Sequence, residues 1–249
     1  MKNYKIFPVL ILAIALFSCG GQADYTGSTT SAKEIPVFTG HESIKHYESA
    51  HKKSDFLNQK NVAFDLELIF GGKERFNGQI ELATTSGYGK MTGIDGHTVS
   101  FNQQDVTWSD TSRSEMSARF AAYTWPYFFL FPYKLSDSGT HWEDTELGFA
   151  HLGQAQKLTF DPGIGDAPDD WYITTPNDQG LIYEAAYIVT AGGTVEEAEK
   201  DPHSIQYSDY RLVNGIPIAH RWEFYAWDKI EGSTELLGEA TLRNVKFSD

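Results

Sequence analysis

The segment 161–170 has the residue types that most resemble a metal site. It reads DPGIGDAPDD and carries carboxylates on Asp161, Asp166, Asp169 and Asp170. Calcium prefers six to eight hard oxygen ligands, and the glycines would allow the tight turns that gather them, but the spacing does not match an EF-hand loop. The interpretation that we favour is a loop whose aspartates accept hydrogen bonds from backbone amides. We therefore predict no cofactor, with calcium at this loop as the alternative.

The eight histidines are not spaced as metal ligands or as parts of a catalytic group. His41, His46 and His51 are five residues apart, so on a helix they fall on different faces. The others are scattered through predicted turns and strands: His97, His141, His151, His203 and His220. Asp169 and Asp170 are adjacent acids without an identifiable partner for acid–base chemistry. The sequence also lacks a haem attachment motif, G-x-S-x-G, a phosphate-binding loop and a dinucleotide motif, so we predict no catalytic residue.

Residues 125–133, with the sequence WPYFFLFPY, form the most apolar stretch downstream of the N-terminal region. Sites for apolar ligands are concave and lined by aromatic and aliphatic side chains, so this stretch could line or cover a pocket. Large aromatic side chains more often fill the core, so it could instead be a plug. In a half-filled barrel, the stretch would serve as a plug in one part and as a pocket wall in another. The candidates for ligand contact are its aromatic residues ahead of the second proline: Trp125, Tyr127, Phe128, Phe129 and Phe131.

Cys19 follows a segment typical of a bacterial lipoprotein signal peptide. Lys2 and Lys5 precede an apolar run over residues 6–17, and the residues on both sides of the cysteine are small. This run is too short to cross a membrane, which takes about 20 residues. An ordinary secretory signal is the alternative, but Cys19 is the only cysteine of the chain and stands where acylation requires one. We therefore predict cleavage after residues 1–18 and lipid attachment at Cys19.

The rest of the chain divides into a tether and a single domain. Residues 19–40 are rich in small and polar residues and predict a flexible tether, whereas residues 41–249 have the length of one domain. The formal charge is −14, and cleavage of the signal would make it more negative by removing Lys2 and Lys5. Because such a surface repels phosphate backbones, nucleic acid is not an expected partner. The expected location is the cell envelope, with the lipid anchor in the outer membrane and the domain facing the periplasm.

The first part of the predicted domain reads as a short helix followed by a meander of strands. Helical spacing predicts a helix over residues 43–53, and strict alternation predicts a strand with one buried face over residues 62–70. Further short strands are predicted at residues 79–84, 88–92, 98–103 and 106–108. The dipeptides that separate them are typical of hairpin turns: Asn77-Gly78, Ser86-Gly87 and Asp95-Gly96.

The second part begins with another helix and returns to strands. The helix is predicted over residues 111–123, with an interruption at Pro126. Strands are predicted at residues 147–151, 156–160, 171–175, 181–190, 204–212, 216–227 and 237–247, with tight turns at residues 177–180 and at Asn214-Gly215. A sheet of about ten strands curls because strands twist. The predicted fold class is mainly β (α+β), with a curled antiparallel sheet forming an open or half barrel around one or two helices.

Three segments of the domain resemble an uncharacterised family of bacterial, Gram-negative envelope lipoproteins. They are residues 127–139, residues 163–170, and residues 207–210 together with residues 213–217. That family is similar in fold to the periplasmic lipoprotein carriers and outer-membrane lipoprotein receptors. The resemblance implies a half-open barrel that holds acyl chains.

The predicted function is that of a lipid-anchored, non-catalytic envelope protein that binds an apolar or amphipathic ligand, such as a lipid, in a half-open β-barrel. The membrane, through the N-terminal lipid, is the other expected partner. One alternative is a scaffold or interaction lipoprotein whose barrel is filled. A further alternative is a hydrolase whose site is assembled from distant strands. Cavity volume separates the first two, because small-molecule sites usually span several hundred Å³.

Overall fold

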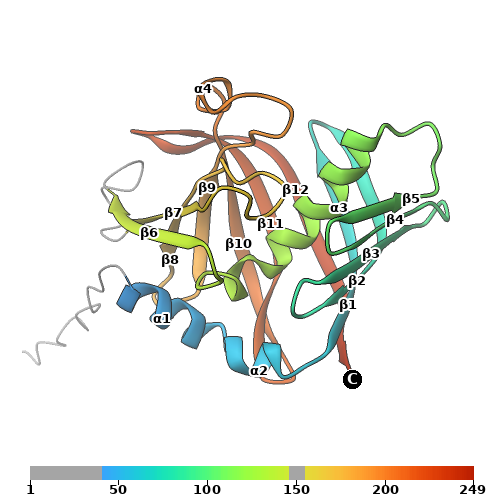
Figure 1. Cartoon of the computed structure of the whole chain (residues 1–249). Coiled ribbons are helices and arrows are strands. Elements are labelled where there is room, and N and C mark those ends of the chain that lie inside the picture. Colours follow the sequence, from blue (N-terminus) through green and yellow to red (C-terminus); the bar gives the residue numbers. More distant parts are fainter. Residues whose placement is uncertain (1–40, 146–154) are drawn as a thin grey trace, which may run out of the picture. The chain divides into compact units, whose positions relative to one another are not determined.

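A curled antiparallel sheet of twelve strands makes up most of the fold (Figure 1). The computed structural model describes residues 41–145 and 155–249. The strand order is β5-β4-β3-β2-β1-β12-β11-β10-β9-β8-β7-β6, so within the described residues the sheet is open and ends at β5 and β6. The predicted fold class, a mainly β protein with a curled antiparallel sheet, is confirmed. The predicted signal peptide, Cys19, the tether and the strand at residues 147–151 lie outside the described residues.

The strands on the N-terminal side of the sheet follow the predicted meander. They are β1 (Asn61–Phe70), β2 (Lys73–Ala83), β3 (Tyr88–Gly93), β4 (Thr98–Asn102) and β5 (Asp105–Trp108). In β1, Val62, Phe64, Leu66 and Leu68 are buried and the residues between them are partly exposed. This alternation places one face of the strand against the core, as its sequence predicts.

Three long strands lie in the middle of the sheet. They are β10 (His203–Val213), β11 (Ile216–Asp228) and β12 (Gly232–Ser248), and β12 also pairs with β1. Asn214 and Gly215 both have positive φ angles, 52° and 80°, as the two central residues of a type I′ hairpin require. The turn predicted there is therefore confirmed. The remaining strands form the other side: β6 (Thr140–Thr145), β7 (Ala155–Phe160), β8 (Tyr172–Pro176) and β9 (Ile182–Tyr187).

Helix α3 (Glu115–Leu130) lies inside the curl of the sheet (Figure 1). The Ser114 side chain caps its first turn by accepting a hydrogen bond from the Ser117 amide. Apolar side chains of α3 and of the 3-10 helix η1 (Phe131–Tyr133) belong to the same core cluster as the inner face of the sheet. The other helices are α1 (His41–Ala50), α2 (Lys53–Leu57) and α4 (Val195–Ala198). None of the helices in the described residues is long and apolar enough to span a bilayer.

The predicted interruption at Pro126 is wrong, because α3 continues through this residue to Leu130. Proline inside a helix removes one hydrogen bond and costs about 3 kcal/mol. Phe128, Phe129 and Leu130 are all buried in the turn that follows. Burying such a side chain contributes about 1.5–3 kcal/mol, so the aromatic turn more than offsets the proline.

The turn predicted at Asn77-Gly78 is also wrong, because both residues lie inside β2. The chain reverses earlier, at Gly71 and Gly72, which have positive φ angles. Gly78 has a different role. A Cβ atom there would lie 2.1 Å from the Thr92 carbonyl oxygen of the neighbouring strand. The glycine is thus required by the close approach of two backbones. In the sequence, such a glycine looks the same as one that belongs to a turn.

Candidate functional site

A cavity of about 390 Å³ opens beside α3, inside the curl of the sheet. Its walls come from α3, from β4 and β7–β9, and from the loops around residues 134–140 and 164–170. Aromatic and aliphatic side chains make up much of the lining, among them Phe101, Phe120, Phe128, Leu130, Phe160 and Val189. The volume lies within the range of about 300–1,000 Å³ that small-molecule sites span. The curled sheet is therefore neither solidly packed nor wide open.

The five aromatic residues predicted to contact a ligand are divided between the cavity and the core. Tyr127 and Phe128 line the cavity, whereas Trp125, Phe129 and Phe131 do not. Residues 125–133 thus contribute to the core as well as to the cavity wall, two roles that were predicted as alternatives.

The three remaining aromatics pack against the sheet and the other aromatic residues. Phe129 stacks on Phe64 of β1, with ring centroids 4.3 Å apart, and is 4% exposed. Trp125 makes an edge contact with Phe224 of β11 at 6.1 Å. Phe131 contacts Tyr172 at 5.0 Å. These side chains fix the position of the helix that forms one wall of the cavity.

Besides Tyr123, two cavity tyrosines outside the aromatic segment were not predicted as site residues: Tyr172 of β8 and Tyr187 of β9. Their rings stack at 6.0 Å, and Tyr127 contacts Tyr172 at 5.6 Å. Burial raises the pKa of all three phenols above the ordinary value, and the Asp170 carboxylate adds to the rise in each. They are therefore neutral hydrogen-bond donors at physiological pH. The only signal for them in the sequence was a buried strand position, which most core tyrosines share.

The structure does not gather the four aspartates of the predicted calcium loop. Asp161 pairs with His141 at 2.7 Å, and Asp166 pairs with Arg119 of α3. One Asp170 oxygen accepts hydrogen bonds from the Thr190 amide and hydroxyl, both at 2.7 Å. Asp169 is exposed. In the described part of the chain, no group of three or more His, Cys, Asp or Glu residues is placed to hold a metal ion.

Two of these aspartates instead belong to the cavity. Asp166 and Asp170 line it together with Asp137 and a single lysine, Lys134. The pKa of Asp170 is raised, mainly because the carboxyl group is buried. The hydrogen bonds from Thr190 act in the opposite direction and lower it in part. The loop that the sequence suggested for a cation thus supplies an acidic border to a largely apolar cavity.

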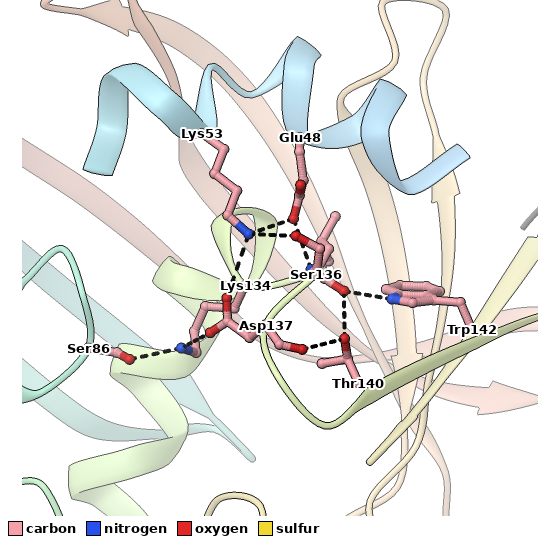
Figure 2. Close-up of polar contacts among 9 residues, drawn as sticks. Glu48, Lys53, Ser86, Lys134, Ser136, Asp137, Thr140 and Trp142 are labelled. Carbon is pink, nitrogen blue, oxygen red and sulfur yellow. Dashed lines mark hydrogen bonds and ion pairs between the residues drawn. The ribbon is translucent and has the colours of Figure 1, made fainter. Parts of the chain in front are cut away.

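Lys134 joins two loops at the border of the cavity (Figure 2). Its ammonium group donates to the Ser86 hydroxyl at 2.8 Å and to Asp137 at 2.5 Å. Asp137 also lies 3.6 Å from the ammonium of Lys53, the first residue of α2. Because Ser86, Lys134 and Asp137 all line the cavity, this network holds three of its border residues in place.

The same network attaches α1 to the loop after η1 (Figure 2). The Glu48 carboxylate accepts hydrogen bonds from the Lys53 ammonium at 2.7 Å and from the Ser136 amide at 2.8 Å. On the far side of the loop, the Trp142 indole donates to the Leu135 carbonyl at 2.6 Å. The loop that carries Lys134 and Asp137 is therefore fixed on both sides.

His51 follows α1 and is buried, with its ring 5.9 Å from Tyr133 and 5.7 Å from Tyr210. Its Nε2 atom accepts a hydrogen bond from the Ile182 amide at 3.0 Å, so the proton of the neutral ring is on Nδ1. Burial lowers the pKa of His51 to about 3. A second proton would also turn Nε2 into a donor that faces the Ile182 N–H.

We expect His51 to make the fold acid-sensitive. Unfolded histidine takes up a proton near pH 6.5, whereas folded His51 does so only near pH 3. The free energy of unfolding should therefore fall as the pH drops through this window, by about 1.4 kcal/mol per pH unit and about 2–3 kcal/mol at pH 4.5. Urea denaturation at pH 7, 5.5 and 4.5 measures this. The His51→Gln variant, which keeps an acceptor, should lose less stability over the same range, and parallel pH profiles would refute the role of His51.

No protein-family model and no curated protein sequence matches the chain. Among solved structures, a LolA superfamily protein from Nitrosomonas europaea is similar with a TM-score of 0.48 and 11% identity, over 82% of this chain and 94% of that chain. A DUF1329 family protein from Desulfovibrio piger has a TM-score of 0.42 and 10% identity, over 82% and 92%. The lipoprotein LppX from Mycobacterium tuberculosis has a TM-score of 0.31 and 8% identity, over 83% and 95%. These similarities assign no family, ligand or activity to this chain.

Proposed function

We propose that this chain is a lipid-anchored envelope protein whose cavity binds an apolar or amphipathic ligand. The observation that carries the proposal is the cavity of about 390 Å³ beside α3, with its aromatic and aliphatic lining. Burial of apolar ligand surface there would supply about 25 cal/mol per Å² before the cost of association. A binding site of this kind requires no covalent chemistry.

The cavity favours binding over the alternative of a filled scaffold. Phe129 and Phe131 are packed into the core, yet Phe128 of the same segment still borders open space. A hydrolase is less well supported. Ser86 and Ser138 line the cavity, but the described lining residues include no histidine that could serve as their base.

The proposed anchor at Cys19 can be tested separately from the cavity. In cells fed radiolabelled palmitate, the wild-type chain should incorporate label and the Cys19→Ser variant should not, because Cys19 is the only thiol available for acylation. The matched control is Ser18→Ala, which changes a neighbouring residue and keeps the thiol. Label in Cys19→Ser, or none in the wild type, would contradict lipid attachment at this residue.

Titration of the chain with a fluorescent apolar probe tests the binding function. Full-length Cys19→Ser protein is the preferred sample, because no acyl chain of its own can then compete for the cavity. We expect saturable binding of one probe per chain, reversed by an unlabelled long-chain amphiphile. Fluorescence that rises without saturation, or that no amphiphile reverses, would contradict the proposal.

A further inference from the structure

The hydroxyl groups of Tyr127, Tyr172 and Tyr187 have no hydrogen-bond partner among the described residues. All three side chains line the cavity, and Tyr172 and Tyr187 are only 7% and 5% exposed. The Tyr47 hydroxyl also lacks a partner, but it is sealed off from accessible space, whereas these three are not. Buried hydroxyls are normally paired, because an unpaired one costs about 1–3 kcal/mol. A molecule that fills the cavity and displaces its water would therefore leave three donors unpaired unless it brings acceptors of its own.

Other tyrosines of the core do not share this property. Tyr133, Tyr207 and Tyr210 donate to backbone carbonyls at 3.1, 3.0 and 2.6 Å. Tyr123, on the α3 side of the same cavity, donates to the Gln103 carbonyl at 2.9 Å. The fold thus pairs the hydroxyls of these four tyrosines and leaves three unpaired at the cavity.

The charges around these hydroxyls restrict the kind of polar group that fits. Asp170 is close enough to add to the raised pKa of each of the three phenols, and Asp137 contributes at Tyr127. Asp166 lines the same cavity. Lys134, the only lysine among the described lining residues, is already bound to Asp137. A carboxylate or phosphate placed here would meet like charge in a poorly solvated space, which is costly.

We propose that the cavity takes a single-chain amphiphile with an uncharged head group that bears hydroxyl or ester oxygens, and that this head lies against Tyr127, Tyr172 and Tyr187. Its oxygens accept from the phenols, and a hydroxyl can donate to the Asp170 carboxylate. The hydrocarbon chain then lies along the aromatic and aliphatic lining. This inference rests on the proposed binding function and adds the chemistry of the ligand.

A comparison of three amphiphiles with the same twelve-carbon chain tests the inference. They are monolauroylglycerol, laurate and dodecyltrimethylammonium, each used below its micelle concentration to displace the apolar probe from full-length Cys19→Ser protein at pH 7.5. We expect monolauroylglycerol to displace the probe at a concentration at least about tenfold lower than either charged compound, as one or two net hydrogen bonds and the avoided charge burial would give.

Two variants connect this preference to the named residues. The Tyr127→Phe, Tyr172→Phe, Tyr187→Phe triple variant should lose most of the preference for the glycerol head, measured relative to its own affinity for the probe. Tyr133→Phe removes a buried hydroxyl that is paired elsewhere, so it should keep the preference. Asp170→Asn removes one negative charge from the lining and retains an acceptor for Thr190. This variant should therefore improve displacement by laurate several-fold.

The outcomes distinguish the two proposals. If the probe does not bind saturably, the binding function fails and this inference fails with it. If the probe binds but the three amphiphiles displace it equally, or a charged one displaces it best, the function stands and the inference is overturned. A preference that the triple Phe variant retains would also overturn it.

Discussion

Phe129→Ala is expected to lower the free energy of unfolding by about 3–5 kcal/mol and to alter the affinity for an apolar probe less than Phe128→Ala does. Phe129 is 4% exposed, stacks on Phe64 with centroids 4.3 Å apart, and does not line the cavity. Removing its ring leaves a void between α3 and β1 that the neighbouring strand can only partly fill. Urea denaturation and probe titration, on the same preparation at a temperature where the variant is folded, measure both effects.

Phe128→Ala is the matched comparison, because it removes the same ring from the preceding residue of the helix. Phe128 contacts Tyr187 at 5.1 Å and Phe224 at 5.7 Å, and it lines the cavity. We expect this variant to lose stability and also to change the probe affinity several-fold. If Phe129→Ala alters binding as much as Phe128→Ala does, the division of the aromatic segment into anchor and wall is wrong.

Thr124→Trp is expected to reduce the affinity for an apolar ligand by about 100-fold or more. Thr124 lies on α3 and lines the cavity, so an indole there would occupy the space in which the ligand is proposed to bind. A loss of 100-fold corresponds to about 2.7 kcal/mol, comparable with the burial of one or two apolar side chains. Competition titration with the fluorescent probe measures the change.

Met116→Trp provides the control for this prediction. Met116 is on the same helix and 66% exposed, and it does not line the cavity. The Met116→Trp variant should bind the probe as the wild type does. Because overpacking at Thr124 could cost about 1–3 kcal/mol of stability, Val189→Trp supplies a second block from the segment after β9. Full affinity in folded Thr124→Trp and Val189→Trp proteins would place the ligand elsewhere.

The sequence predicted most of the sheet, because most strands carry their own local pattern, but it did not predict β6 (Thr140–Thr145). Val62, Phe64, Leu66 and Leu68 alternate within a single strand, and Asn214-Gly215 specifies its hairpin within two residues. The failures arose where the deciding contact is distant. Gly78 is needed inside β2 because the Thr92 backbone lies close to it. Helix α3 continues beyond Pro126 because the aromatic side chains that follow are buried.

The candidate site could be predicted only in part for the same reason. The aromatic segment is visible in the sequence, but which of its rings face open space depends on how the helix packs against β1 and β11. Tyr172, Tyr187 and Asp170 come from segments about 40–60 residues later in the chain and meet Tyr127 only through the curl of the sheet. No spacing along the chain encodes that meeting.

Native mass spectrometry can show whether the cavity beside α3 holds an apolar or amphipathic molecule. Full-length Cys19→Ser protein, and the same protein carrying Thr124→Trp, would be purified from cell envelopes without detergent exchange and compared. We expect a population with one added amphiphile mass in the first protein and a much smaller one in the second. Equal occupancy in the two folded proteins, or no bound mass even after incubation with monolauroylglycerol, would contradict ligand binding in this cavity.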